Sequence, residues 1–183
     1  ETLRGEIAST NTYTNTERTA DSLVIGWNGS QDKHLWQAAA RYDDNSQFGS
    51  KTTHTLGYGY RVTPQWRVAV NTGTSFKAPT FNDLYFPNTP FVGAGNPALQ
   101  PETGRTHELA LHYEADHYQA SLTAFRNNIR NLIQWEESPP GSFFYSPRNV
   151  GEARISGLTA AAKTRLANWT LGAHLTLQNP KDK

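Results

Sequence analysis

The sequence lacks cysteine, lacks any long apolar run and carries almost no net charge, and each absence narrows what the protein can be. Without cysteine there is neither a disulfide framework nor a thiolate metal site. No apolar run approaches the roughly 20 residues of a membrane helix, although a barrel strand crosses a bilayer with only about 9–11 residues of alternating character. A net charge of +1 gives no reason to expect nucleic acid as a partner.

What the sequence does contain is a regular series of potential strands. They lie near residues 2–9, 19–28, 34–43, 52–62, 65–75, 104–115, 117–128, 152–164 and 167–178. The connectors between them alternate between long (10–18, 44–51, 76–103, 129–151) and short (29–33, 63–64, 116, 165–166). This alternation predicts an all-β fold, an antiparallel up-and-down transmembrane β-barrel segment of about nine strands with long outer loops and short periplasmic turns.

Alternation along the strands assigns their two faces. In 104–115, Leu109 and Leu111 fall on one face and Glu108 and Ala110 on the other, and four further strands repeat this period of two. A charge facing lipid at the bilayer midplane costs about 2–4 kcal/mol. The charged residues that we assign to the opposite, lumen-facing side are Arg41, Arg61, Arg67, Glu108 and Lys163. Asp21, which shares a face with Leu23, is the exception, and we place it above the apolar band.

The positions of the aromatic residues distinguish a barrel wall from a sheet packed on a protein core. The rings on the apolar face, all within a few residues of a short turn, are Trp27, Trp36, Trp66, Tyr113, Tyr118 and Trp169. A membrane–water interface selects amphipathic rings at one level. A soluble β-sandwich remains the alternative, and burial of Leu109, Leu171 and Val68 in a sealed core would favour it.

Several segments carry a family resemblance. They are SFKAPT (75–80), LY (84–85), NPALQPE (96–102), FRNNI (125–129), LI (132–133) and NVGEARISGL (149–158). Together they resemble the barrel signature of TonB-dependent outer-membrane receptors. A further stretch, AARYDDNSQFG (39–49), is similar to the matching loop of the cobalamin (vitamin B12) receptors, and haem and siderophore receptors share parts of it.

The resemblance implies a location in the bacterial outer membrane and a barrel of about 22 strands. It also implies a plug domain that fills the barrel, contact with outer-membrane lipid, and energy delivered through TonB. On this reading residues 1–183 are a partial β-barrel domain whose plug and remaining strands are absent, and the cargo imported is cobalamin. A siderophore or haem receptor remains an alternative, as does a soluble adhesive or binding β-domain. None of the three longest outer loops contains a histidine that could be an axial haem ligand, which favours cobalamin over haem.

The candidate ligand-binding residues are aromatic and lie in the two longest outer loops. We select Tyr85 and Phe86 in 76–103, and Trp135 and Tyr145 in 129–151. Exposed rings with polar neighbours suit the capture of a large amphiphilic ligand. The alternative is that these rings pack among themselves and stiffen the loops. In cobalamin receptors, the resemblance implies, the main cargo contacts come from the plug and other loops.

We predict no catalytic residues, metal site or cofactor. The segment Asp43-Asp44-Asn45 offers oxygen ligands but lacks the spacing of a calcium loop, and we interpret it as a solvated turn. The histidines show no zinc-binding spacing. There is neither a nucleophile elbow nor a definable catalytic triad, so the sequence does not indicate an enzyme.

Overall fold

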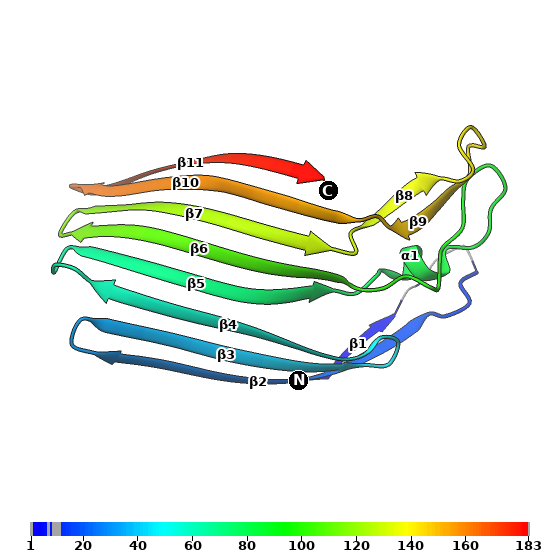
Figure 1. Ribbon diagram of the computed structural model, residues 1–183, viewed down its shortest axis with the longest axis horizontal. Coiled ribbons are helices and arrows are strands. Elements are labelled where there is room, and N and C mark those ends of the chain that lie inside the picture. Colours follow the sequence, from blue (N-terminus) through cyan, green and yellow to red (C-terminus); the bar gives the residue numbers. More distant parts are fainter. Residues whose placement is uncertain (1, 7, 9–11, 183) are drawn as a thin grey trace.

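The computed structural model describes residues 2–6, 8 and 12–182. Nine strands form one antiparallel sheet (Figure 1). In sheet order they are β1 (Thr2–Glu6), β2 (Glu17–Gln31), β3 (His34–Asn45), β4 (Gly49–Arg61), β5 (Trp66–Lys77), β6 (Glu102–Ala115), β7 (Tyr118–Arg130), β10 (Glu152–Leu166) and β11 (Trp169–Asp182). Within the described residues, no helix is long and apolar enough to cross a membrane.

Each of the nine predicted segments corresponds to a strand of this sheet, which confirms the up-and-down plan. Strands that follow one another pair side by side, and β7 pairs with β10 across an inserted segment. The predicted first strand, 2–9, is observed as Thr2–Glu6, and its residues 7 and 9 lie outside the described part of the chain. The ladders keep one register along their whole length, so the period-2 assignment of faces holds from end to end.

Tight turns gather at one end of the sheet and long connections at the other (Figure 1). Residues 32–33, 116–117 and 167–168 are two-residue connectors. Asp32 (φ 52°) and Ala167 (φ 50°) adopt the positive φ that such hairpins use. The long loop predicted over 44–51 is wrong, because the β3–β4 ladder continues to the Asn45–Gly49 pair and leaves only 46–48 as connector.

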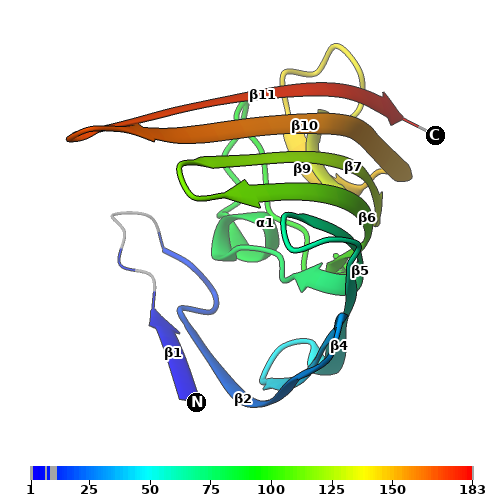
Figure 2. The ribbon, with the colours of Figure 1, turned by 90° about the vertical axis from the view of Figure 1, so that its left-hand side faces the viewer.

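The sheet is curved, and its two faces differ in burial. Figure 2, seen from the end with the short turns, shows an open arc. Leu109 and Leu171 are 54% and 55% exposed, and Val68 is half-buried, so these three side chains do not form a sealed core. Ala69 and Ala110, which are register partners on the opposite face, are buried. Curvature crowds side chains on the concave face, which we therefore assign to the lumen.

Aromatic rings cluster on the apolar face near the short turns, as predicted. Trp66 and Tyr113 pair across β5 and β6 with ring centroids 4.8 Å apart. Trp27 and Trp36 stack at 6.5 Å across β2 and β3, and His34 continues the group by stacking on Trp36 at 5.8 Å. This belt marks the level of one membrane–water interface.

Counted from the short turns, each of the long strands (β2–β7, β10 and β11) has room for one bilayer crossing before its outer face becomes polar, whereas the described part of β1 lies opposite residues 17–21, at and above that level. That change comes about ten residues above the turn, at His54, His107 and Arg126 for example, and about ten residues is the crossing length of a tilted strand. Asp21 lies at this level in β2, opposite Thr2 of β1 and Asp44 of β3, which agrees with the position predicted for it above the apolar band. The strands of 12 to 15 residues therefore extend beyond the bilayer at the outer end.

The sequence did not indicate two small elements in the long outer connections. Helix α1 (Phe81–Tyr85) interrupts the β5–β6 connection, and β8 (Ile133–Glu137) pairs with β9 (Tyr145–Asn149) as a separate hairpin between β7 and β10. A capping box fixes the start of α1, because the Thr80 hydroxyl accepts from the Asp83 N–H and the Asp83 carboxylate accepts from the Thr80 N–H.

Candidate functional site

The candidate site lies where the β5–β6 connection (78–101) meets the β8–β9 hairpin, at the outer end of the sheet (Figure 1). We call this region the loop junction. The prolines of the β5–β6 connection lack the backbone donor that a ladder needs, which keeps this segment off the sheet. Pro79 and Leu84 are nevertheless fully buried, so the connection has a small core of its own.

Asp83 links the two halves of the loop junction. One carboxylate oxygen accepts from the Thr80 N–H at 2.8 Å and from the Thr80 hydroxyl at 2.7 Å, and the other accepts from the Trp135 indole N–H at 2.9 Å. Burial raises the pKa of Asp83. The hydrogen bonds from Thr80 and Trp135 together lower that pKa by more than burial raises it, so the pKa lies below its ordinary value. The carboxylate therefore stays charged and holds Trp135 against α1.

Ring packing and backbone pairing reinforce this link. Phe86 meets Trp135 edge to face, with ring centroids 5.9 Å apart at 89°. The Ala94 N–H donates to the Tyr145 carbonyl at 3.0 Å, and the Tyr145 N–H donates to the Val92 carbonyl at 3.2 Å. The chain at Gly93 runs so close to β9 that a Cβ there would lie 2.2 Å from the Tyr145 carbonyl oxygen.

Two asparagines join the loops a second time, nearer the sheet. The Asn96 side-chain amide donates to the Pro147 carbonyl at 3.0 Å. The Asn149 side chain both donates to the Gln100 carbonyl (2.9 Å) and accepts from the Gln100 N–H (2.8 Å). With these bonds the loop junction is a single packed platform rather than two independent loops.

A cation connects the platform to the neighbouring loops. The Arg18 guanidinium lies 5.1 Å from the Phe48 ring and 5.0 Å from the Phe81 ring, and it donates to the Gln47 side chain and the Pro79 carbonyl, each at 2.7 Å. Such cation–π contacts contribute about 0.5–2 kcal/mol each, more when the cation is desolvated. Arg18 thus joins the start of β2, the β3–β4 turn and the segment before α1.

All four predicted ligand-binding residues lie in the loop junction. Phe86 and Trp135 contact each other, as the alternative of mutual packing expects, while Trp135 remains 38% exposed. Tyr145 is 43% exposed beside this pair, and Tyr85 is half-buried at the end of α1. The structure thus brings the four together, while their contact with a ligand stays a prediction.

Two further rings are more exposed than any of the four. Phe91 is 82% exposed in the turn between Thr89 and Gly93, and Phe143 is 70% exposed directly after the turn formed by residues 139–142. Both have positive φ, 59° and 56°, which is uncommon for an aromatic residue. Phe91 follows Pro90 in a turn closed by hydrogen bonds between Thr89 and Gly93, where sequence preference would place glycine. For Phe91, a bulky residue directly after a proline at a turn is the signal that the sequence offered.

The Asp43-Asp44-Asn45 segment is not the solvated turn that we predicted. It lies inside β3, because the β3–β4 ladder extends past it, and Asp43 is buried. The Arg41 guanidinium lies 2.8 Å from the Asp43 carboxylate, which also accepts from the Ser22 hydroxyl at 2.6 Å. Among the described residues, no group of three or more His, Asp or Glu side chains could hold a metal ion.

Comparison with known protein families shows that the chain matches the β-barrel domain of one family. Residues 3–183 match the family model described as "TonB dependent receptor-like, beta-barrel". Curated relatives include the vitamin B12 transporter BtuB of Vibrio vulnificus, 34% identical over 155 residues, and that of Photobacterium profundum, 38% identical over 133 residues. These alignments cover 85% and 69% of this chain but only 24% and 21% of the relatives, so the chain spans about a quarter of their length.

Solved structures share the fold. The siderophore receptor PirA from Pseudomonas aeruginosa superposes with a TM-score of 0.78 at 23% identity, over 91% of this chain and 33% of that one. The iron transporter FrpB from Neisseria meningitidis gives a TM-score of 0.69 at 14% identity, over 94% of this chain and 27% of that one. At these identities the likeness concerns the fold alone.

Proposed function

Because the chain belongs to the TonB-dependent receptor family, as a segment of its β-barrel, we propose that it forms part of the wall and outer loops of a receptor that imports cobalamin. Receptors of this family are transporters of the bacterial outer membrane, so the chain is an outer-membrane protein and not an enzyme. The observation that carries the choice of cargo is the 34–38% identity to vitamin B12 transporters.

The loop junction gives the proposal a physical site. Tyr145 and the exposed part of Trp135 offer flat amphipathic surfaces, with Tyr85 and Phe86 supporting them from α1. Phe91 and Phe143 extend this surface at the loop tips. Because the platform is already ordered by its internal hydrogen bonds, little conformational entropy is lost when a large ligand settles on it. In the whole receptor a plug domain blocks the lumen, and TonB supplies the energy that moves it.

Uptake by cells tests the cargo. Cells that depend on the intact receptor are expected to accumulate cyanocobalamin and to stop when its gene is deleted. Normal cobalamin uptake after deletion, or uptake of a ferric siderophore or haem alone, would remove cobalamin from the proposal. Competition with ferric chelates distinguishes these outcomes in one assay.

Binding to loop variants tests the site. The double variant Phe91→Ser with Phe143→Ser is expected to weaken cyanocobalamin binding roughly tenfold, since each aromatic contact contributes about 0.5–1.5 kcal/mol. Val62→Ser is the matched control, an exposed apolar residue at the opposite, short-turn end of the sheet. Equal affinity of the double variant and the control would show that these two loop-tip rings do not contact the cargo.

A further inference from the structure

The outer face of the sheet carries a group of cations directly above its apolar band. Continuous registers put these residues on the same face as Leu109, Leu122 and Leu158. The cations are Arg105 of β6, Arg126 and Arg130 of β7, Arg154 of β10 and Lys181 of β11. We call this group the outer basic patch. Glu152 is the one carboxylate at this level on the outer faces of the described strands β5, β6, β7, β10 and β11.

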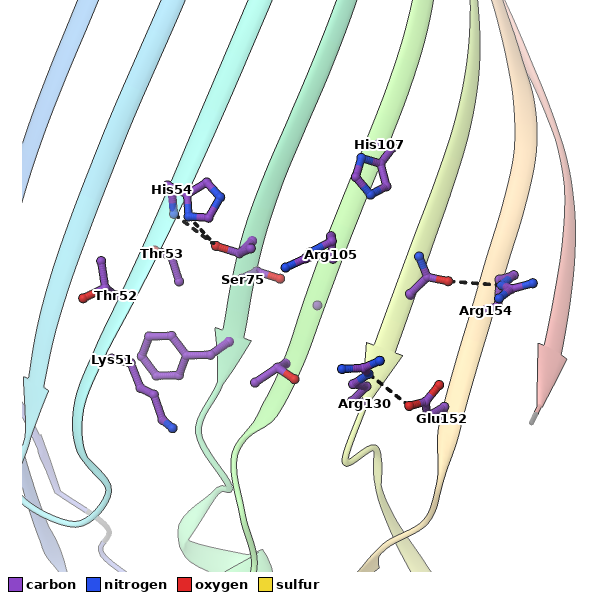
Figure 3. A pocket seen from close by; sticks show the side chains of 15 residues that line it. Lys51, Thr52, Thr53, His54, Ser75, Arg105, His107, Arg130, Glu152 and Arg154 are labelled. Atoms are coloured by element: carbon purple, nitrogen blue, oxygen red, sulfur yellow. Dashed lines mark hydrogen bonds and ion pairs between the residues drawn. The ribbon is translucent and has the colours of Figure 1, made fainter.

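Four of the five cations have no negatively charged partner, and three of these four have no side-chain partner of any kind among the described residues. Arg130 forms an ion pair with Glu152 at 3.0 Å, and Arg154 donates to the Asn128 side chain at 3.1 Å (Figure 3). Within the described residues, Arg105, Arg126 and Lys181 have neither a hydrogen bond nor an ion pair through their side chains, and all three are exposed. A group of like charges without counter-charges is costly unless an anion joins it.

The patch is also hollowed. A recess of about 540 Å³ lies across β4, β5, β6, β7 and β10, with Arg105, Arg130 and Arg154 on its wall together with His54 and His107 (Figure 3). It opens where the β4–β5 ladder ends, at the Thr55–Gly73 pair, while both strands continue outward. The recess has room for a charged headgroup beside the protein wall.

The height of the outer basic patch above the apolar band indicates which kind of ligand it can bind. Arg126 follows Ala124 on the outer face of β7, and Lys181 follows Asn179 and Leu177 on that of β11, so the cations begin one or two outward positions above the apolar band. Successive outward positions are about 7 Å apart along a strand. The cations therefore lie at the headgroup level of the outer leaflet, at the end of the sheet where the long loops are.

We propose that the outer basic patch binds the phosphorylated headgroup of an outer-leaflet glycolipid whose acyl chains lie along the apolar band below. Arginine matches phosphate geometry with two parallel N–H donors, and basic side chains near a membrane surface attract anionic headgroups. Glu152 holds Arg130 in place without neutralising the rest of the patch. This binding concerns the outside of the barrel and is independent of the cargo at the loop junction.

Titration of the intact, detergent-solubilised receptor with diphosphorylated lipid A tests the proposal. The triple variant Arg105→Gln, Arg126→Gln, Lys181→Gln removes only the unpartnered cations, so it leaves no buried partner behind. Each surface charge contributes about a factor of five, so the triple variant is expected to bind on the order of a hundredfold more weakly. Dephosphorylated lipid A is expected to bind the wild type as weakly as the phosphorylated lipid binds the triple variant.

The matched control removes the same charge from the other face. Arg61, Arg67 and Lys163 are exposed, and their registers place them on the lumen side. Their triple substitution by Gln is expected to leave lipid affinity unchanged. The triple variant of the patch must also keep the resistance of a folded barrel to unfolding in cold detergent, and the Arg105→Lys single variant should retain binding.

Three results would overturn the proposal. One is unchanged lipid A affinity in the folded triple variant of the patch. Another is an equal loss in the lumen-side control, because the effect would then follow net charge rather than position. The third is displacement of lipid A by inorganic phosphate at millimolar concentration, since that would identify a site for the free anion instead of a lipid.

Discussion

At the scale of single residues, Asp83 is the hydrogen-bond acceptor that holds the loop junction together. Asp83→Asn keeps the size of the side chain but removes the negative charge of the carboxylate, whose oxygens accept hydrogen bonds from Thr80 and Trp135. We expect chymotrypsin to cleave the outer loops of the intact receptor roughly fivefold faster at neutral pH, about the effect of losing one partly exposed charge-assisted hydrogen bond. Asp44→Asn, an exposed carboxylate of β3 outside the junction, is the control.

The same carboxylate sets a pH dependence. Because the folded-state pKa of Asp83 lies below its ordinary value of 3.8, its contribution is fully present above 3.8 and is lost as pH falls through the lowered pKa. Pepsin cleavage of the wild type and of Asp83→Asn should therefore converge as pH falls below 3.8. A constant ratio of the two rates across that range would show that Asp83 does not act through its charge.

Gly95 is the second residue that the loop junction requires, because there is no space for a side chain at this position. A Cβ at this position would lie 2.6–2.7 Å from backbone atoms of residues 84–86, which cannot move without opening the end of α1. We expect Gly95→Ala to destabilise the loop junction by about 1–3 kcal/mol, the usual cost of overpacking, seen as faster loop proteolysis. Gly172→Ala, whose Cβ would lie 3.8 Å from the Ala162 carbonyl oxygen, an ordinary van der Waals contact, should leave cleavage unchanged.

At the scale of strands, adjacent residues should respond oppositely to charge. Leu122, 49% exposed, lies on the apolar face near the middle of a bilayer crossing, and Thr123 faces the lumen. Leu122→Arg is expected to lower the free energy of unfolding of the receptor in lipid vesicles by about 2–4 kcal/mol, with Thr123→Arg costing far less. Tryptophan fluorescence during denaturant titration measures both. Equal losses would contradict the assignment of faces.

The long strands of the main sheet, all but β1, could be predicted from the sequence because the period of two is a local signal that each of them repeats over ten or more residues. The β8–β9 hairpin could not, since five residues such as Ile133–Glu137 carry too little alternation to stand out within a loop. The extension of β3 and β4 was missed because Asp43 and its neighbours are polar. The buried Asp43 accepts hydrogen bonds from Ser22 of β2 and from Arg41, and the Ser22 contact joins residues far apart in the sequence, which a local pattern does not reveal.

At the scale of the molecule, the loop junction shows the limit of such prediction. The sequence identified Tyr85, Phe86, Trp135 and Tyr145 as loop aromatics but could not show that Phe86 packs on Trp135, because about fifty residues separate them. Composition likewise gave no hint of the outer basic patch. A net charge of +1 conceals the patch, since the acidic side chains other than Glu152 lie outside it.

The open arc itself leads to the last prediction. The described sheet ends at β1 and β11, which form the two edges of the arc (Figure 2). The side chains of its apolar face are exposed. Unpaired strand edges and a broad apolar face promote association. Residues 1–183 produced alone are therefore expected to aggregate or pair edge to edge in buffer and to become monodisperse only in detergent, as measured by light scattering. A soluble monomer that unfolds cooperatively without detergent would show that the apolar face does not require lipid, and would favour the soluble β-domain over the barrel wall.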